Sequence, residues 1–397
     1  MSVFVLPIRL TNALVLTFWA GALAWLVLAG GSPVVAADRL TLRAPSREYP
    51  TIQSAIDASL PGGRVVIPLG EFVESLDVRG KVVDLVGEGA DGARSTVLVA
   101  PDARRAVITY GPGGGGILRD VLLQGGAVGI RGETGSDPRS DRTIRPAPIT
   151  VNDVRIRGSV HGVFGKFSGL TLRKTEVHGT AWNGITILEV EDLRALKVFV
   201  HDTGNVGLLL KNFTPGLFPF EVLKSTFSNN AGGGIAVIGH GRPVVISDSD
   251  VSANAVAGVY LLDAGFTHIL KTHLAATKIG QSPQVSGVGD GLIVWSSPNV
   301  FIEKSNIVGN ARAGLLVQGC SPEHVSFVLI GKSTSTANRF GIVVQTSPQL
   351  GQASFPCTGT DTGASFSGPP EQFFGNADAD ILMSGNLKTP DQPLETP

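Results

Sequence analysis

The sequence has few cysteines, few aromatic side chains and few charges. Of its 397 residues two are Cys, 6% are aromatic and 16% are charged, and the formal net charge is −1. The absence of tandem cysteines excludes a zinc ribbon, an iron–sulfur protein and a disulfide-dense miniprotein. The balanced charge lacks the basic footprint of a general nucleic-acid binder, and a hydrophobic fraction of 43% excludes a disordered chain.

Glycine, by contrast, is abundant. Its 51 residues make up about 13% of the chain, against a usual level of roughly 7%. Together with many Val, Ile and Leu and few charges, this composition favours many short strands joined by tight turns.

The N-terminus carries an uncharged apolar run over residues 13–31. Arg9 precedes the run, and Val35 and Ala37 fit a signal-peptidase site before Asp38. The run has 19 residues, close to the roughly 20 that span a bilayer, so an uncleaved anchor is the alternative. Both interpretations place the rest of the chain outside the cytoplasm, and we expect a secreted, periplasmic or cell-envelope protein.

The two cysteines are Cys320 and Cys357. In an oxidising compartment they predict one disulfide, which would tie the irregular C-terminal segment to the repeats before it. Two buried free thiols are the alternative.

A Gly followed by an aliphatic residue recurs along most of the chain. The intervals are 22 to 33 residues, and the longer ones fit a basic unit of 22–24 residues with an inserted loop. An Asn often lies three or four residues before the Gly, which is typical of a turn that leads into a strand. The pairs are Gly129-Ile130, Gly162-Val163, Gly184-Ile185, Gly207-Leu208, Gly234-Ile235, Gly258-Val259, Gly291-Leu292, Gly314-Leu315 and Gly341-Ile342.

Residues after each Gly alternate between apolar and variable, as in a half-buried strand. A second block precedes each Gly strand, for example FEVLKSTFSN (220–229), with apolar first, third and eighth positions. This pattern predicts a strand, a one-residue bend and another strand, and it does not fit a helical period. One interior column is expected to contain Ile185, Leu208, Ile235, Val259, Leu292 and Leu315.

Three short strands per unit cannot bury their apolar face alone, but parallel stacking of the units gives a continuous core. The sequence therefore predicts an all-β, single-stranded right-handed parallel β-helix. The repeat blocks resemble those of the pectin-lyase-like superfamily, including its NosD-type repeat proteins. Residues 49–89 are also similar to the entrance of that fold, which implies a short capping helix with Ile52, Ala55, Ile56 and Leu60 on one face. The resemblance is specific for the fold and unspecific for the reaction.

The expected organisation has five parts and two inserted loops. The loops, at 131–148 and 277–290, are candidates for a binding face, with solvated decoration as the alternative. The parts are a signal peptide or anchor at 1–37, an N-terminal cap at 38–64, the β-helix at 65–345, an irregular segment with a partial last coil at 346–386 and a disordered tail at 387–397.

A column of lysines is predicted at the bend, the fifth position of the second block. It contains Lys174, Lys197, Lys224, Lys271 and Lys304, with Asp248 interrupting it after Lys224. Stacked ammonium groups are candidate ligands for an acidic polysaccharide. The alternative is a bend that simply faces water, as the Asp residues at the same phase suggest.

Two histidines hold equal positions in adjacent blocks. His178 and His201 are expected to stack one strand apart, with Asp202 beside His201. An imidazole oriented by a carboxylate suits acid–base catalysis, so these are the candidate catalytic residues, with polar turn residues as the alternative. We predict no metal site and no cofactor. The catalytic motifs typical of polygalacturonases, pectin methylesterases and alginate epimerases are missing, apart from a short match at 239–241.

The outward side chains of the Gly strands are mostly apolar, which is unusual on a secreted monomer. We expect the chain's own tail, another copy of the chain or a protein partner to cover them. They include Thr186, Leu209, Ala236, Tyr260, Ile293, Leu316 and Val343.

The favoured function is an extracytoplasmic β-helix that binds an acidic polysaccharide; if it is an enzyme, the expected class is a polysaccharide lyase or a glycoside hydrolase. This rests on the family resemblance, which is an associational argument, and it leaves open whether the protein is an enzyme. The alternative is a non-catalytic structural, adhesion or assembly module of the cell envelope. A NosD-like accessory role in metal-site maturation is disfavoured because Cys, Met and His clusters are scarce. No nucleic-acid partner is expected.

Overall fold

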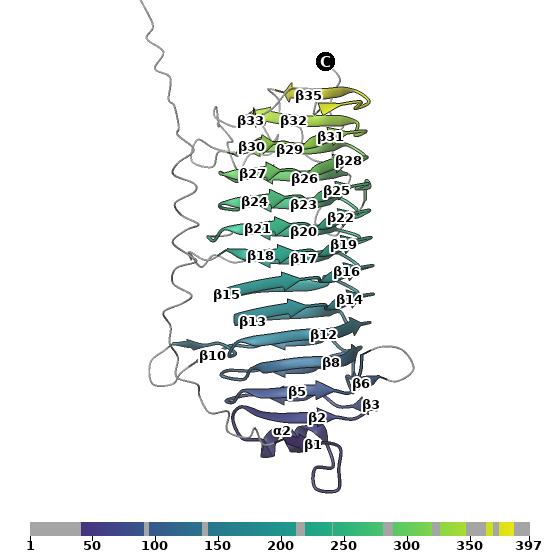
Figure 1. Cartoon of the computed structure of the whole chain (residues 1–397), viewed down its shortest axis with the longest axis vertical. Helices are drawn as coiled ribbons and strands as arrows, with labels where there is room; N and C mark the ends of the chain where they lie inside the picture. The colour runs from purple at the N-terminus through teal and green to yellow at the C-terminus, as the bar shows by residue number, and fades with distance from the viewer. Residues whose placement is uncertain are drawn as a thin grey trace, which may run out of the picture. The chain divides into compact units, whose positions relative to one another are not determined.

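Three short strands per coil, stacked in parallel, build the molecule in the computed structural model (Figure 1). The structure describes residues 41–90, 95–136, 142–211, 219–239, 241–280, 289–319, 326–346, 363–367 and 373–384. It is a solenoid of about 11 turns, as the repeat predicted. Among the described residues, no helix has the length and apolar character needed to cross a membrane.

The Gly strands form one face of the solenoid, which we call the Gly face. Each strand pairs in parallel with the Gly strand of the next coil. The strands are β4 (Leu76–Val78), β7 (Ala106–Tyr110), β9 (Val128–Gly132), the start of β13 (His161–Arg173), the start of β15 (Ile185–Leu196), β17 (Val206–Lys211), β20 (Gly233–Ile238), β23 (Ala257–Leu262), β26 (Asp290–Trp295), β29 (Ala313–Gly319), β32 (Phe340–Thr346) and β35 (Ala379–Ser384).

The strands before the bend form the second face. They are β1 (Thr41–Arg43), β2 (Gly63–Ile67), β5 (Val83–Gly87), the starts of β8 (Gly116–Gln124) and β12 (Ile149–Arg157), the ends of β13 and β15, β18 (Phe220–Leu223), β21 (Val244–Ser247), β24 (Thr267–Leu270), β27 (Val300–Glu303), β30 (Phe327–Gly331) and β33 (Gly363–Ser367).

The strands after the bend form the third face. They are β3 (Gly70–Val73), β6 (Thr96–Val99), the ends of β8 and β12, β14 (Glu176–His178), β16 (Phe199–His201), β19 (Thr226–Ser228), β22 (Asp250–Ser252), β25 (His273–Ala275), β28 (Asn306–Val308), β31 (Thr334–Thr336) and β34 (Phe373–Phe374). The C-terminal segment thus carries three strands, β33, β34 and β35, where one partial coil was expected.

The helix α2 (Ile52–Ala58) closes the N-terminal end of the core. Thr51 and Ser54 form a capping box at its start, and Ile52, Ala55 and Ile56 are buried. The expected fourth apolar contact is wrong, because the helix ends at Ala58 and Leu60 is 61% exposed. Burying the other three still hides the apolar end of the first coil from water.

The interior follows the predicted pattern. Ile185, Leu208, Ile235, Val259, Leu292 and Leu315 stand in register in one column, and each is at most 1% exposed. One continuous apolar core runs through the described coils.

The Gly column is required by the close approach of neighbouring coils. A Cβ built on Gly234 would lie 2.6 Å from the carbonyl oxygen of Gly258 and 2.9 Å from the amide nitrogen of Asn254. Real Cβ atoms do not come this close to backbone, so the backbones can stack only where this side chain is missing.

Asparagines stack beside the Gly column as a buried ladder. The backbone N–H and the Nδ2 group of Asn310 both donate to Oδ1 of Asn338, at 2.9 Å each. Asn230 donates to Asn254 in the same way. Such a ladder satisfies buried backbone groups at the turn, which would otherwise be costly. The expected turn role of these residues is confirmed, and it extends from coil to coil.

The bend residues lie in the left-handed region, with φ between 45° and 57° in nine successive coils. Non-Gly residues rarely adopt this conformation, and Asn and Asp tolerate it best. From Ser225 onward, the residue after the bend carries a buried hydroxyl group. These hydroxyl groups form a second ladder, in which the backbone N–H of Ser305 donates to Ser333 Oγ at 3.0 Å. The bend residues are Asp120, Asp153, Lys174, Lys197, Lys224, Asp248, Lys271, Lys304 and Lys332.

We predict that Gly234→Ala destabilises the fold by about 1–3 kcal/mol, because the new methyl group forces two coils apart. Gly169→Ala is the matched control, since its Cβ would meet only Pro148 Cβ at an ordinary 3.4 Å. Urea unfolding of both variants checks this. Equal losses in the two variants would contradict the steric account.

The Asn ladder has one gap, at Thr277, whose buried hydroxyl has no hydrogen-bond partner. Its backbone N–H still donates to Asn310 Oδ1 at 3.0 Å. We predict that Thr277→Asn raises the free energy of unfolding by about 0.5–1.5 kcal/mol, because the new amide completes the ladder. Thr277→Val, which only removes the hydroxyl, should gain less. A lower melting temperature for the Asn variant than for the wild type would refute this.

Candidate functional site

The bend lysines stack in one column, as predicted. Registers of the flanking strands place Lys197 next to Lys174 and Lys224 next to Lys197 in successive coils. Their side chains are exposed. Lys174 lines a groove, while Lys271 lies beyond the interruption at Asp248. The column as a whole therefore fits a water-facing bend, and one of its members belongs to a site.

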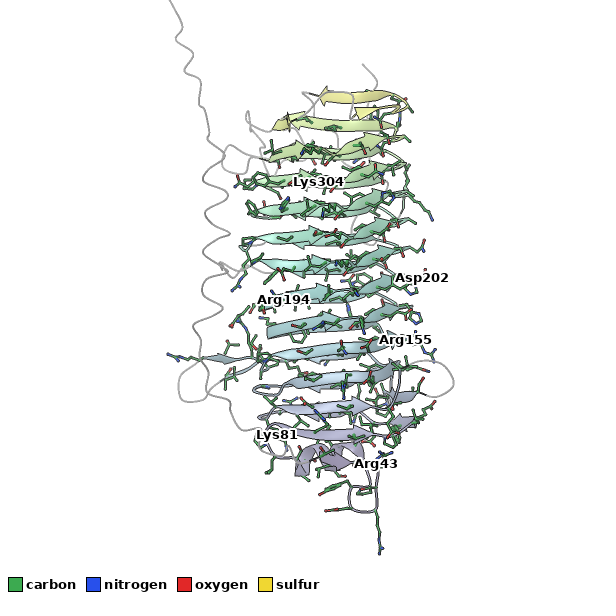
Figure 2. The ribbon with its side chains drawn as sticks, viewed as in Figure 1. Arg43, Lys81, Arg155, Arg194, Asp202 and Lys304 are labelled. Atoms are coloured by element: carbon green, nitrogen blue, oxygen red, sulfur yellow. The ribbon has the colours of Figure 1, made fainter. Side chains whose placement is uncertain are left out.

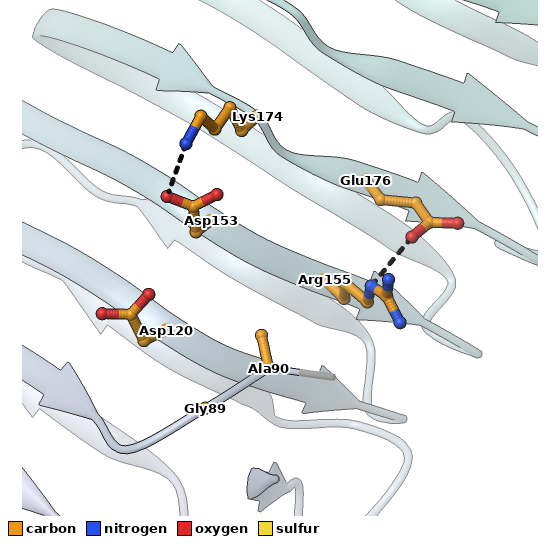
Figure 3. Close-up of a pocket in the computed structure, with 7 residues that line it drawn as sticks. All are labelled: Gly89, Ala90, Asp120, Asp153, Arg155, Lys174 and Glu176. Carbon is orange, nitrogen blue, oxygen red and sulfur yellow. Dashed lines mark ion pairs between the residues drawn. The ribbon is translucent and has the colours of Figure 1, made fainter. Parts of the chain in front are cut away.

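That groove, the Glu176 groove, lies at the bend between the second and third faces and has a volume of about 400 Å³. Lys174 Nζ lies 3.5 Å from Asp153 Oδ2, and Arg155 Nε lies 3.0 Å from Glu176 Oε2, as Figure 3 shows. Asp120, Gly89 and Ala90 complete the lining. Two cations and three carboxylates thus meet on three adjacent coils.

The predicted histidine pair borders this groove on the third face. His178 and His201 are in register, and their rings stack with centroids 5.1 Å apart at 3°. The Nδ1 atom of His201 lies 2.6 Å from Asp202 Oδ2, and its Nε2 atom lies 3.2 Å from Glu176 Oε1. The structure therefore brings His178, His201 and Asp202 together and joins them to the groove through Glu176.

His201 is held on three sides. Carboxylates face both ring nitrogens, and the Phe199 ring stacks on it at 4.2 Å. A neutral imidazole has one N–H, so it can donate to only one of the two carboxylates at a time. The arrangement fixes the orientation of His201 firmly. Arg155 and Asp202 lie at the same edge of the solenoid (Figure 2).

The ring of His178 differs from that of His201 in its hydrogen bonding. No described residue forms a hydrogen bond with its ring, and its partial burial lowers its pKa, an effect that His201 and Arg157 reinforce and that Glu176 and Asp202 oppose. Arg157, its register partner in the preceding coil, is tied to Gln124 Oε1 at 2.9 Å. A lowered pKa keeps the imidazole neutral at neutral pH, which is the form that accepts a proton.

The sequence did not single out Glu176, Arg155 or Arg157. All three point outward from third-face strands. Arg157 is the register partner of His178, whereas Glu176 and its own register partner Arg155 lie two residues earlier along their strands. Extending the histidine phase back one coil would have reached Arg157, and stepping two residues along the strand would have reached Glu176.

The inserted loop at 131–148 contributes charge to the Gly face. It holds a small antiparallel hairpin, β10 (Gly135–Ser136) with β11 (Thr143–Ile144), which the sequence did not predict. Arg145 then contacts Glu189 at 3.1 Å and Glu191 at 2.6 Å, and Lys166 contacts Glu189 at 2.8 Å. Lys166 and Arg145 lower the pKa of Glu189. These charges neutralise one another, so this part of the loop stabilises the face.

The apolar side chains expected on the Gly face are largely covered. Ile293, Leu316 and Val343 are at most 5% exposed and belong to a second apolar cluster outside the core. The other members of the cluster are Val256, Ala257, Ala313 and Phe340.

Three predicted features lie outside the described residues: the disulfide between Cys320 and Cys357, the signal sequence or anchor at 1–37, and the disordered tail at 387–397. Within the described part of the chain, no group of three or more His, Cys, Asp or Glu side chains is arranged to hold a metal ion.

A family model described as a right handed beta helix region matches residues 117–274 and 220–355. The chain belongs to the right-handed β-helix family. This confirms the fold and the resemblance inferred from the repeat. None of the curated proteins matches this sequence.

Solved structures extend the likeness of this β-helix protein. It is similar to the A-module of the Azotobacter vinelandii mannuronan C-5 epimerase AlgE4, at 17% identity and a TM-score of 0.51, covering 86% of this chain and 92% of that one. It is also similar to the catalytic domain of a GH87 α-1,3-glucanase in complex with nigerose, at 17% identity and a TM-score of 0.58, covering 87% of this chain and 65% of that one. Its fold thus resembles those of polysaccharide-acting enzymes, and at this identity the likeness concerns the fold alone.

His161, a half-buried residue at the start of β13, gives a pH prediction. Burial, and secondarily Arg131, lower the pKa of His161, whose buried Nδ1 has no hydrogen-bond partner. Its folded-state pKa therefore lies below the unfolded value of about 6.5. As pH falls below about 6.5 the unfolded chain binds the proton first, so the free energy of unfolding is highest above this pH and falls below it.

Unfolding midpoints at about pH 7.5 and 5.5 check this. We expect the wild type to lose stability between them and His161→Gln to lose less. His178 and His268, whose pKa values burial also lowers, supply the remaining loss. An identical slope in the His161→Gln variant would contradict the assignment.

Proposed function

We propose that this protein binds an acidic polysaccharide and cleaves it by proton abstraction at the Glu176 groove. The observation that carries the proposal is the free, partly buried His178 ring, which lies between Arg157 and the held ring of His201. We also propose that it works outside the cytoplasm, as its N-terminal sequence predicts.

Removing a proton next to a carboxylate requires a neutral base and a cation that stabilises the charge that develops. The lowered pKa of His178 supplies the base. Arg157 stands one coil away in the same outward column and is the cation nearest in register. In this reaction His178 takes the C5 proton of a uronate, and the electron pair forms a C4–C5 double bond as the glycosidic bond breaks.

The leaving oxygen needs a proton, and we assign that donor to the Nε2–H group of His201, where the leaving oxygen takes the place of Glu176 as hydrogen-bond acceptor. Glu176 and Asp202 act as positioning residues, because they face its two ring nitrogens and fix the plane of the ring. Lys174 and Arg155 then contact the sugar's acidic groups at the groove, although each also has a carboxylate neighbour.

Two solved structures of similar fold support a polysaccharide as the substrate class, because their names are those of a mannuronan epimerase and an α-1,3-glucanase. The alternative of an assembly module depended on an exposed apolar strip. Since Ile293, Leu316 and Val343 are buried, that alternative has less support.

The test uses His178→Gln, with His273→Gln as the matched control on the same face four coils further along. Both variants and the wild type are assayed on polyuronates and on a neutral glucan at low salt, with unsaturated products and new reducing ends measured separately. We expect His178→Gln to lower turnover of the polyuronate about 10²–10⁴-fold with little change in binding, and His273→Gln to behave as the wild type.

Three results would count against the proposal. Binding of no acidic polysaccharide by the wild type would remove the substrate class. Equal turnover in the two variants would remove His178 as the base. Reducing ends without unsaturation would mean hydrolysis, for which the stacked carboxylates Asp120 and Asp153 are the candidates.

A further inference from the structure

A second groove, the arginine groove, lies on the second face, on the other side of the bend column. It has a volume of about 440 Å³. Arg64, Arg119 and Arg173 line it together with Asp84 and Asn152. The arginines come from the strands β2, β8 and β13, so widely separated parts of the sequence build the groove.

The groove has a surplus of positive charge. Asp84, its single lining carboxylate, is buried, accepts a hydrogen bond from the Ile117 backbone at 3.1 Å and lies 3.7 Å from Arg64. Among the described residues Arg173 has no ion pair, and the nearest carboxylate to Arg119 is Asp120 at 3.8 Å. Three guanidinium groups therefore face one carboxylate.

One of these guanidinium groups also lacks a hydrogen bond. The Nε atom of Arg64 is buried and has no partner. A buried donor without an acceptor is costly. The Arg64 side chain as a whole is 37% exposed, so its guanidinium group can turn toward an oxyanion in the groove. Guanidinium groups are well suited to this, because their planar N–H groups match a carboxylate or sulfate in pairs.

The arginines are regularly spaced along the solenoid. Arg119, Asn152 and Arg173 are register partners in three successive coils. Arg64 lies two coils before Arg119, because it pairs with Asp84 and the strand of Asp84 pairs with that of Arg119. With strands about 4.8 Å apart, a cation recurs about every 10 Å. Regular spacing of this kind fits a linear polymer with repeated acidic groups better than a single small anion.

We propose that the arginine groove is a distal binding site for the acidic groups of a polysaccharide whose reacting residue lies in the Glu176 groove. The identity of the ligand rests on the proposed function, and the basic character of the groove does not. The two grooves share the bend as a wall, since Arg119, Asn152 and Arg173 each precede a bend residue that lines the Glu176 groove.

The division of charge between the grooves explains why both are needed. The Glu176 groove has more carboxylates than cations, which suits chemistry but not affinity for a polyanion. Asp153 connects the two grooves. It accepts a hydrogen bond from Asn152, which lines the arginine groove, at 2.8 Å, and it lies 3.5 Å from Lys174, which lines the Glu176 groove. The arginine groove therefore supplies the attraction, and the Glu176 groove supplies the acid–base groups.

The experiment combines Arg119→Gln and Arg173→Gln in the full chain. The control combines Lys224→Gln and Lys271→Gln, which removes the same charge from exposed bend positions outside both grooves. Calorimetric titration with uronate oligomers of two and of ten or more sugars, and with inorganic sulfate, measures binding at two salt concentrations. Thermal unfolding confirms that both variants are folded.

We expect the arginine variant to bind the long oligomer roughly 10- to 100-fold more weakly, with a smaller salt dependence, and to bind the dimer as the wild type does. The control should match the wild type on both. Equal binding of the long oligomer by the arginine variant and the wild type overturns the distal site and leaves the proposed function standing if His178→Gln still abolishes turnover. A wild type that binds sulfate but no uronate oligomer overturns the polysaccharide assignment of both grooves.

Discussion

The close approach of stacked coils at the Gly column is the constraint on which the structure depends. A Cβ at any of eight successive glycines, Gly129 to Gly314, would lie 2.5–2.7 Å from the carbonyl oxygen of the next one. This fixes one residue type per coil, sets the parallel register of the Gly face and leaves room for the Asn amides that satisfy the turn. Once that register is fixed, the interior columns, the left-handed bend and the outward columns all follow from counting residues along the strand.

The same constraint explains how much could be predicted from sequence. Gly and apolar positions must repeat in every coil, so the fold and the interior column that contains Ile235 were readable from periodicity. The bend was located correctly, but its left-handed conformation was not, because Lys is an uncommon residue there. Leu60 was misplaced because an apolar residue just past a short helix has the same spacing as one inside it.

The site was only partly predictable for a physical reason. Outward side chains are not needed for stacking, so their identities change from coil to coil and carry no period. Equal phase sufficed for His178 and His201, which are register partners. Glu176 and Arg155 are also register partners in adjacent coils, but an Arg and a Glu at outward positions are typical of any solvated face and did not indicate a site. The arginine groove was missed for the same reason, since its side chains stand in two neighbouring outward columns.

The described coils differ in what their outer surfaces do. The coils from β2 to β14 carry both grooves, whose polar side chains are at least partly exposed to solvent apart from the buried Asp84. Further along, the Gly face is buried under apolar packing, and Arg312 donates to the fully buried Asp290 at 2.8 Å from Nε. A buried ion pair of this geometry contributes little net stability against an apolar pair, but removing one partner would leave a buried charge. The ion pair therefore mainly fixes the register between β26 and β29. Asp290 also accepts a hydrogen bond from the Ala313 backbone N–H at 2.9 Å. In the C-terminal coils, apolar packing and the buried ion pair fix the register of the Gly face. In the N-terminal coils the outward residues are under no such constraint, and the charged and acid–base side chains of both grooves lie there.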